Sequence, residues 1–119
     1  MGTTTVEVRL ANVTDPDRHV DVDMIVDSGA IYSVVPTPIL RGIGIESQGP
    51  ETFRMADGRN IRRDIGHALF EIQGRSAPSR VIFGRRGDAC LLGMVALEEL
   101  GLALDALKRR LRPIRLMIA

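Results

Sequence analysis

The segment Met24-Ile25-Val26-Asp27-Ser28-Gly29-Ala30 decides the fold of this chain, because an apolar run leads directly into a carboxylate and a tight turn. An apolar strand that ends in Asp places the acid at the mouth of the core. The glycine that follows allows the backbone to pass close to another group, since it has no Cβ. Only one Asp-Ser-Gly occurs in the sequence. Chemistry that needs two such carboxylates would therefore need a second copy of the chain.

Size and composition predict a single domain that spans residues 1–119. The chain is 45% hydrophobic, which is enough for one core. Lys and Arg total 16 against 15 for Asp and Glu, and the net charge of +1 predicts neither a nucleic-acid nor a membrane partner. The N-terminal residues lack the basic and apolar regions of a signal peptide, which predicts a cytoplasmic protein. The open alternative is a part of a longer, processed precursor.

The cysteine and the histidines give no sign of a redox or metal site. Cys90 lies between Ala89 and Leu91, and these apolar neighbours predict a small buried residue, not a nucleophile. His19 and His67 are far apart in sequence and belong to no ligand cluster. We therefore expect neither a metal nor a cofactor.

Short alternating stretches of β-branched residues, bounded by Gly, Pro and Asp, predict an all-β fold. Aromatic residues make up only 3% of the chain. Alternation in the first stretch is clear, with Val6, Val8 and Leu10 on one face. The expected strands are Thr3–Ala11, a second from His19 or Val20 to Val26, Ile31–Val35, the two arms of Glu51–Ile72, Val81–Phe83, Ala89–Leu92, Leu102–Leu104 and Leu111–Ile118. Met94–Leu100 has the one convincing helical period and ends at Gly101, with a further short helical turn expected after Pro36.

The centre of the stretch Glu51–Ile72 is polar and reads Met55-Ala56-Asp57-Gly58-Arg59. Asp-Gly between two strands is typical of a hairpin with a type I′ turn, which requires positive φ at both central residues. The sequence therefore predicts a hairpin whose tip is Ala56-Asp57-Gly58.

Three features in order resemble the retropepsin-like aspartic proteases, in particular the small single-lobe bacterial and archaeal members related to retroviral proteases. They are Asp27-Ser28-Gly29-Ala30, the hairpin tip Ala56-Asp57-Gly58, and Leu91-Leu92-Gly93 directly before the helix. The resemblance extends from about Val6 to Leu104. It implies a closed β-barrel of the retropepsin type, with one short helix in the C-terminal half and a flap hairpin.

The resemblance also implies a role for each of these residues. Asp27 would be catalytic, and Ser28, Gly29, Ala30 and Ile31 would form the active-site loop and contact substrate. Ala56, Asp57 and Gly58 would be the tip of a mobile flap. Leu91, Leu92 and Gly93 would form a second loop that supports the first. Walls of apolar pockets are expected from Ile31, Val35 and Val81–Phe83.

Metal-free peptide hydrolysis of this kind needs a base that deprotonates water and an acid that protonates the carbonyl oxygen. Two adjacent carboxylates that share one proton do both, as is known for aspartic proteases. Because the chain has one Asp-Ser-Gly, we expect a homodimer in which Asp27 faces its copy across a twofold axis. The expected substrate is an extended peptide or an unfolded protein.

Two departures from the retroviral pattern are visible. Retroviral enzymes carry an Asp shortly after the signature and an Arg after the second Gly, and these positions are here Ile31 and Met94. Both members of an ion pair have become apolar together, which can be neutral or stabilising. The flap lacks a glycine-rich tip and carries Asp57, Arg59 and Arg62. From Ile31 and Met94 we expect a different dimer interface and different contacts to the substrate ends, and from the flap residues a flap that is stiffer, more polar or more selective.

Two further readings stay open. The protein could be a non-catalytic dimerisation or peptide-binding module that keeps the protease fold. The basic C-terminal stretch, residues 108–119, could be a solvated face, a dimer-forming strand or a joint to a longer precursor.

Overall fold

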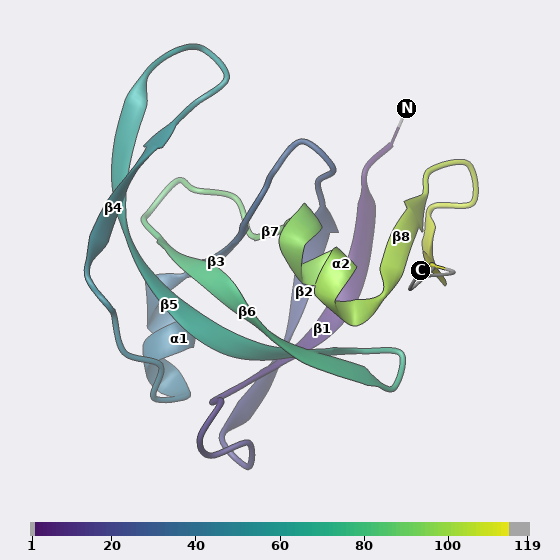
Figure 1. Ribbon diagram of the computed structural model, residues 1–119, viewed down its shortest axis with the longest axis horizontal. Helices are drawn as coiled ribbons and strands as arrows, with labels where there is room; N and C mark the ends of the chain where they lie inside the picture. Colours follow the sequence, from purple (N-terminus) through teal and green to yellow (C-terminus); the bar gives the residue numbers. More distant parts are fainter. Residues whose placement is uncertain (1, 115–119) are drawn as a thin grey trace, which may run out of the picture.

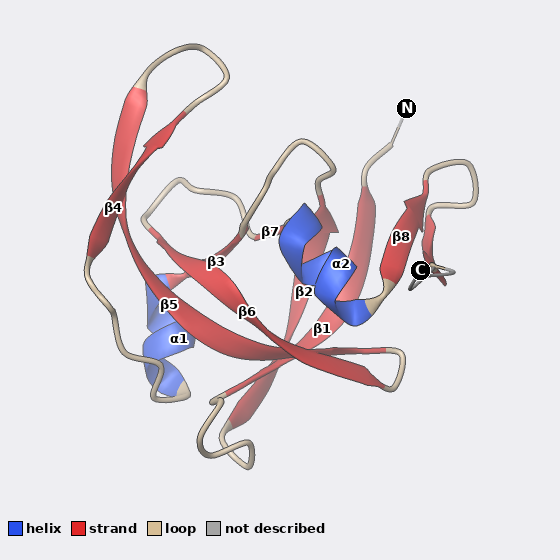
Figure 2. Cartoon of the chain, viewed as in Figure 1, coloured by secondary structure: helices blue, strands red, loops and turns tan. Residues whose placement is uncertain are grey.

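The computed structural model describes residues 2–114, and within them the chain is mostly β, as the alternating pattern predicted (Figure 2). The elements along the chain are β1 (Thr4–Ala11), β2 (His19–Val26), β3 (Ser33–Pro36), α1 (Thr37–Gly42), β4 (Pro50–Arg54), β5 (Asn60–Ile72), β6 (Arg75–Gly84), β7 (Leu91–Leu92), α2 (Met94–Leu100), β8 (Leu102–Asp105) and β9 (Arg110–Pro113). The helix expected over Met94–Leu100 is confirmed with the same bounds.

The strands form a seven-stranded sheet in the order β1-β2-β7-β3-β6-β5-β4, and β8 pairs with β9 separately. β5 also pairs with β1, where Leu10 lies opposite Phe70. The pairings therefore run from β1 through β2, β7, β3, β6 and β5 and return to β1. Figure 1 shows the result, with the β5–β6 hairpin crossing β1 and β2 and the β4–β5 arm extending away from the body.

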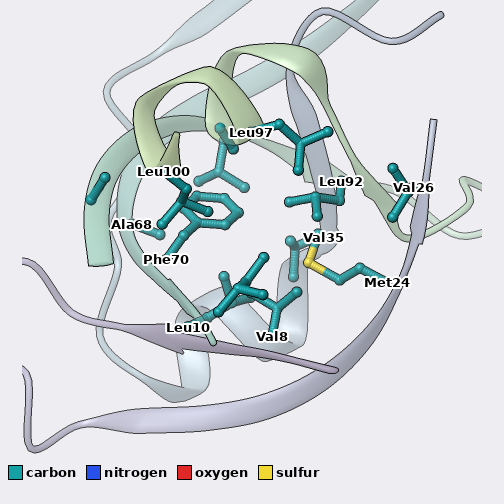
Figure 3. Close-up of a cluster of buried hydrophobic side chains, with 14 of the residues drawn as sticks. Val8, Leu10, Met24, Val26, Val35, Ala68, Phe70, Leu92, Leu97 and Leu100 are labelled. Carbon is teal, nitrogen blue, oxygen red and sulfur yellow. The ribbon is translucent and has the colours of Figure 1, made fainter. Parts of the chain in front are cut away.

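The core lies inside this circuit of strands and is closed by α2 (Figure 3). Val8 and Leu10 of β1, Phe70 of β5 and Leu97 of α2 are fully buried. The first two lie two positions apart because successive strand residues point to opposite faces. Met24 of β2 is also fully buried, so the core residues next to Asp27 are rigidly packed.

Two predicted strands begin later than the sequence suggested. Ile31–Val35 was expected as a strand, but β3 begins at Ser33. The carbonyls of Ala30 and Ile31 instead accept hydrogen bonds from the first turn of α2, so they are not available to a neighbouring strand. The segment Ala89–Leu92 is likewise reduced to the two residues of β7.

β6 begins at Arg75 and is therefore much longer than the predicted strand Val81–Phe83. Pro78 lies within it and cannot donate a backbone hydrogen bond. It is tolerated because β3 pairs only with the Val81–Gly84 end of β6, so the earlier residues have a strand on one side alone.

Only part of the strand expected over Leu111–Ile118 lies within the described residues. β9 covers Arg110–Pro113, where Leu111 is buried opposite Leu104. The remainder of the expected strand Leu111–Ile118, and of the basic stretch 108–119, lies outside the described residues from position 115 onward.

Ser79 in β6 offers a test of the core. Its hydroxyl is buried and has no hydrogen-bond partner among the described residues. A buried hydroxyl without a partner loses its hydration and gains nothing in return. We expect Ser79→Ala to raise the free energy of unfolding by about 1 kcal/mol, measured by urea denaturation. Ser76→Ala, at an exposed position of the same strand, is the control. Destabilisation by Ser79→Ala alone would show that the hydroxyl is satisfied.

Candidate active site

Asp27 directly follows β2 and is held by β7. Its backbone N–H donates to the carbonyl of Leu92 over 3.1 Å, and the N–H of Ile25 donates to the carbonyl of Cys90 over 3.0 Å. β2 and β7 are parallel here, and β2 has β1 on its other side. The acid therefore leaves the sheet from an interior strand, whose backbone is restrained on both sides.

The turn after Asp27 is built around its own carboxylate. The Gly29 N–H donates to Oδ1 of Asp27 over 2.8 Å, and the Ala30 N–H donates to the carbonyl of Asp27 over 3.1 Å. A Cβ on Gly29 would lie 3.2 Å from the same Oδ1. Glycine is therefore favoured here because the backbone passes close to the carboxylate, and not because of a positive φ. Oδ2 has no hydrogen-bond partner within residues 2–114. The half-buried carboxylate thus keeps one oxygen free for a ligand or a second carboxyl group.

The loop from Ala30 to Ile31 also completes α2. The first N–H groups of a helix have no partner within the helix. Those of Met94 and Val95 donate to the carbonyls of Ala30 and Ile31 over 2.9 and 3.0 Å. The helix has no side-chain cap, so this backbone contact replaces one. The two segments whose sequences carried the resemblance therefore meet directly, as predicted.

Gly93 lies at the point of closest approach between these two segments. A Cβ at this position would lie 2.5 Å from the carbonyl carbon of Tyr32 and 2.8 Å from the carbonyl oxygen of Ile31. Real side chains do not reach such distances to backbone atoms. Any residue other than glycine would push the loop that carries Asp27 away from α2.

Ser33 is a site residue that the sequence analysis missed. Its side chain is fully buried, and its hydroxyl accepts the Gly93 N–H over 3.0 Å, across sixty positions in sequence. The sequence signal that could have found it is the alternation of strand residues. Ser33 is two positions before Val35 and so shares the buried face of β3. A hydroxyl on a core face needs a partner, and that partner here is the second loop.

The hairpin of β4 and β5 is confirmed, but its expected type I′ turn is wrong. The Met55 carbonyl accepts the Gly58 N–H over 3.0 Å, so Ala56 and Asp57 are the central residues of the observed turn. Of Asp57 and Gly58, the pair expected at the centre of a type I′ turn, only Gly58 has a positive φ, at 88°. Asp57 instead accepts the Arg59 N–H over 2.9 Å and the Arg59 Nε over 2.7 Å. A type I′ hairpin has a two-residue loop, whereas the loop here has three residues, Ala56, Asp57 and Gly58. Three-residue hairpin loops typically form a type I turn followed by a glycine.

The inner face of this hairpin is apolar toward its tip. Phe53 lies opposite Ile61, and both are half-buried. Met55 follows on the same alternation and is 39% exposed. Arg54 and Arg62 lie on the opposite, solvent-exposed face.

β4 is attached to the segment that follows the Asp27 loop. The rings of Phe53 and Tyr32 pack edge to face with centroids 6.2 Å apart. The guanidinium of Arg80 lies over the Tyr32 ring at 5.1 Å and pairs with Glu51 over 3.1 Å. The base of β4 is thus tied both to β6 and to the residue after Ile31.

β5 is attached to the segment that precedes β7. Arg63 forms a two-bond ion pair with Asp88, Nε to Oδ2 over 2.8 Å and Nη2 to Oδ1 over 3.1 Å. The two side chains are only 15% and 25% exposed. The Arg63 guanidinium holds the pKa of Asp88 below its ordinary value of 3.8, and the Arg85 N–H acts in the same direction while burial opposes it. The sequence alone does not reveal this partner, because the two residues are 25 positions apart.

The Arg63–Asp88 pair makes the free energy of unfolding depend on pH. Because the pKa of Asp88 is lowered in the folded state, its contribution is present above about pH 4 and is lost as the pH falls through that lowered pKa. We expect Asp88→Asn to be less stable than the wild type at about pH 6 and the difference to shrink toward about pH 2, as followed by thermal unfolding.

The control for this prediction is Asp21→Asn, which removes the exposed Arg9–Asp21 pair on β1 and β2. Both of those side chains are more than 40% exposed, so its effect is expected to be smaller. A stability difference for Asp88→Asn that does not change with pH would contradict the prediction.

The structure brings together two of the three predicted groups of site residues. Asp27–Ile31 and Leu91–Gly93 are in direct contact. Ser28 and Ile31 are exposed, Ile31 by 64%. The third group, Ala56–Gly58, lies at the exposed hairpin tip, which Figure 1 shows well apart from the loop between β2 and β3.

The predicted pocket walls need a correction. Val35 and Val81–Phe83 are buried, so they cannot line a surface pocket. They were expected as walls alongside the roles that the resemblance implies, but their strands β3 and β6 pair with each other. Exposed apolar side chains are instead found at Ile31 on the loop and at Met55 beside the hairpin tip.

Two shallow hollows lie near α1 and the β1–β2 turn and are lined in part by Arg18, Arg41, Glu46 and His67, none of which belongs to the predicted site. Within residues 2–114 no three His, Cys, Asp or Glu side chains are grouped to hold a metal ion. Over the same residues, no helix has the length and apolar character to cross a membrane.

Partial burial raises the pKa of the Cys90 thiol, which disfavours its reactive thiolate.

No family model matches the sequence, and no curated protein matches it either. Solved structures do match. The structure of EIAV protease in complex with the inhibitor HBY-793 superposes with a TM-score of 0.59 at 19% sequence identity, over 84% of this chain and 89% of that chain. The chain has the fold of retroviral proteases. The solution structure of simian foamy virus (mac) protease gives a TM-score of 0.55 at 19% identity, over 79% of this chain and 91% of that one.

The retroviral-protease fold agrees with the resemblance read from the sequence. At 19% identity the likeness concerns the fold alone. The bacterial or archaeal affinity inferred from the sequence stays a prediction, as do the activity of Asp27 and the dimer.

Proposed function

We propose that this protein is an aspartic endopeptidase of the retropepsin type, active as a homodimer with one Asp27 from each subunit. The observation that carries the proposal is the way in which Asp27 is held in the structure. Its carboxylate is half-buried, has one oxygen bonded to Gly29 and one free, and lies on a loop restrained by β7 and α2. The likeness in fold to retroviral proteases supports the same reading. The circuit of strand pairings supports a closed barrel beneath the site.

In the proposed mechanism the two Asp27 carboxyl groups share one proton and bind a water between them. The ionised carboxylate takes a proton from the water, which attacks the peptide carbonyl, while the protonated partner donates to the carbonyl oxygen. The Gly29 N–H stays on Oδ1 and fixes the orientation of the carboxylate. Ser28 would bond the backbone of the other subunit and join the two loops beneath the acids.

The proposed substrate is an extended peptide or an unfolded protein segment. A strand-like peptide between the flap and Asp27 would be recognised through its backbone, with alternate side chains in pockets. The exposed Ile31 and Met55 favour apolar side chains next to the cleaved bond. Flap closure over the peptide would exclude water from the site. We also propose that the protein works in the cytoplasm, without a nucleic-acid or membrane partner.

The test of this function is cleavage of an unfolded protein by the wild type and by Asp27→Ala at about pH 4 to 7. Cleavage products from the wild type alone are the expected result. Asp23→Ala, which removes an exposed carboxylate from β2, is the matched control and is expected to keep activity. Equal cleavage by wild type and Asp27→Ala would refute the proposal. A wild type that binds extended peptides and cleaves none would favour the non-catalytic module instead.

A further inference from the structure

We propose that Arg63 and Asp88 are positioning residues that couple the flap to the loop carrying Asp27. This inference rests on the proposed function for its catalytic consequence, but its structural part can be tested without activity. It starts from the observation that the flap is attached at its base through side chains on both of its strands.

The first attachment is on β4, through Phe53 against Tyr32 and Glu51 to Arg80. The second is on β5, through Arg63 and Asp88. Glu51 and Arg63 lie directly opposite each other in the hairpin register. The two ion pairs therefore act at the same level of the hairpin, and Phe53, opposite Ile61, adds a contact two residues nearer the tip. Residues 54–60, beyond Phe53 and Ile61, form the part that is left to move as a lid.

The Arg63–Asp88 attachment leads to Asp27 by a short path. Asp88 closes the tight turn 85–88, where its Oδ2 accepts the Arg85 N–H over 2.8 Å. The chain then runs to Cys90, whose carbonyl accepts the Ile25 N–H. Ile25 is two residues before Asp27, and the next bond of the same ladder joins the Asp27 N–H to Leu92.

The pair is well suited to carry such a coupling. Its two-bond geometry fixes both the distance and the orientation of the guanidinium, unlike a single contact between mobile charges. At 15% and 25% exposure it is also shielded from the solvent screening that weakens surface pairs. A displacement of the flap base would thus be passed to the turn 85–88, and through it to the β7–β2 ladder.

The test compares Arg63→Gln, Asp88→Asn and the double variant by amide hydrogen exchange. In Arg63→Gln, the amides of Ile25 and Asp27 are expected to exchange about tenfold faster, because the ladder loses its support. The amide of Val8 on β1 is the internal reference for global unfolding. The double variant is expected to match the singles, since the two residues act as one unit.

The matched control is Arg9→Gln, which breaks an exposed ion pair on β1 and β2. It is expected to leave exchange at Asp27 and peptidase activity unchanged. Arg63→Lys keeps the charge but loses the two-bond geometry, and is expected to give an intermediate effect and to show that the protein still folds. Unchanged exchange at Ile25 and Asp27 in Arg63→Gln, or an equal increase at Val8, would overturn the coupling.

The kinetic counterpart concerns kcat. If Asp27 loses its exact placement, kcat is expected to fall about tenfold in Arg63→Gln while KM changes less. A rise in KM alone would mean that the pair only holds the flap against substrate, which would also overturn the coupling. A wild type without peptidase activity would refute the proposed function, and the exchange experiment would still decide the inference.

Discussion

Mixing wild-type subunits with Asp27→Asn subunits is expected to lower peptidase activity as the square of the wild-type fraction. Only dimers with two Asp27 carboxylates can hold the shared proton and the water. Mixed dimers, with one Asn, lack either the base or the acid. Pure Asp27→Asn is expected to lose activity by about a thousandfold or more, because both roles depend on the pair.

The mixing experiment separates a shared site from two independent ones. Asn keeps the side-chain oxygen that accepts the Gly29 N–H, so the turn and the fold are expected to survive the substitution. Circular dichroism and sedimentation equilibrium check that the variant still folds and dimerises. Activity that falls linearly with the wild-type fraction would contradict a site made of two Asp27 residues. A wild type that sediments only as a monomer at micromolar concentration would contradict it as well.

Replacing Gly93 by Ala is expected to lower the free energy of unfolding by roughly 2 to 3 kcal/mol. The added Cβ would lie 2.5 Å from the carbonyl carbon of Tyr32 and 2.7 Å from its oxygen. These are backbone atoms, so no side-chain rotation can relieve the overlap. Separation of the loops would also weaken the bond from the Gly93 N–H to the buried Ser33 hydroxyl.

Gly42→Ala is the matched control for Gly93→Ala. A Cβ on Gly42 would meet nothing within 4 Å, and its φ is not positive. Alanine there is expected to be neutral or slightly stabilising, since it restricts the unfolded chain. Urea denaturation of both variants measures the difference. Equal stability of the two variants would show that the close approach of Gly93 to Tyr32 carries no cost.

Much of the fold could be predicted because its determinants are local. Alternation in Val6, Val8 and Leu10 marks β1, and the helical period with Gly101 marks α2 at its observed bounds. The Asp-Gly pair marks the hairpin, although not its turn type. Each signal depends on residues within a few positions of one another, so side-chain direction and turn chemistry suffice to read it.

The errors arose where distant segments compete for the same groups. Ile31 reads as a strand residue, but its carbonyl is used by α2, so β3 starts later. Val35 reads as a pocket wall, but the pairing of β3 with β6 buries it. The partner of Asp88 could not be inferred, because Arg63 is twenty-five positions away on the flap.

By itself the sequence determined that the chain is mostly β, that an apolar strand leads into Asp27, and that one glycine lies two positions after this acid and another directly before the predicted helix. Tertiary structure alone decided why those glycines are needed and what supports the acid. The carbonyls of Ala30 and Ile31 complete α2, the Ser33 hydroxyl accepts the Gly93 N–H, and the β4–β5 hairpin is tied to Asp88. Which carbonyl meets which N–H depends on the pairing of strands far apart in the chain, and residue type at one position does not encode its distant neighbour.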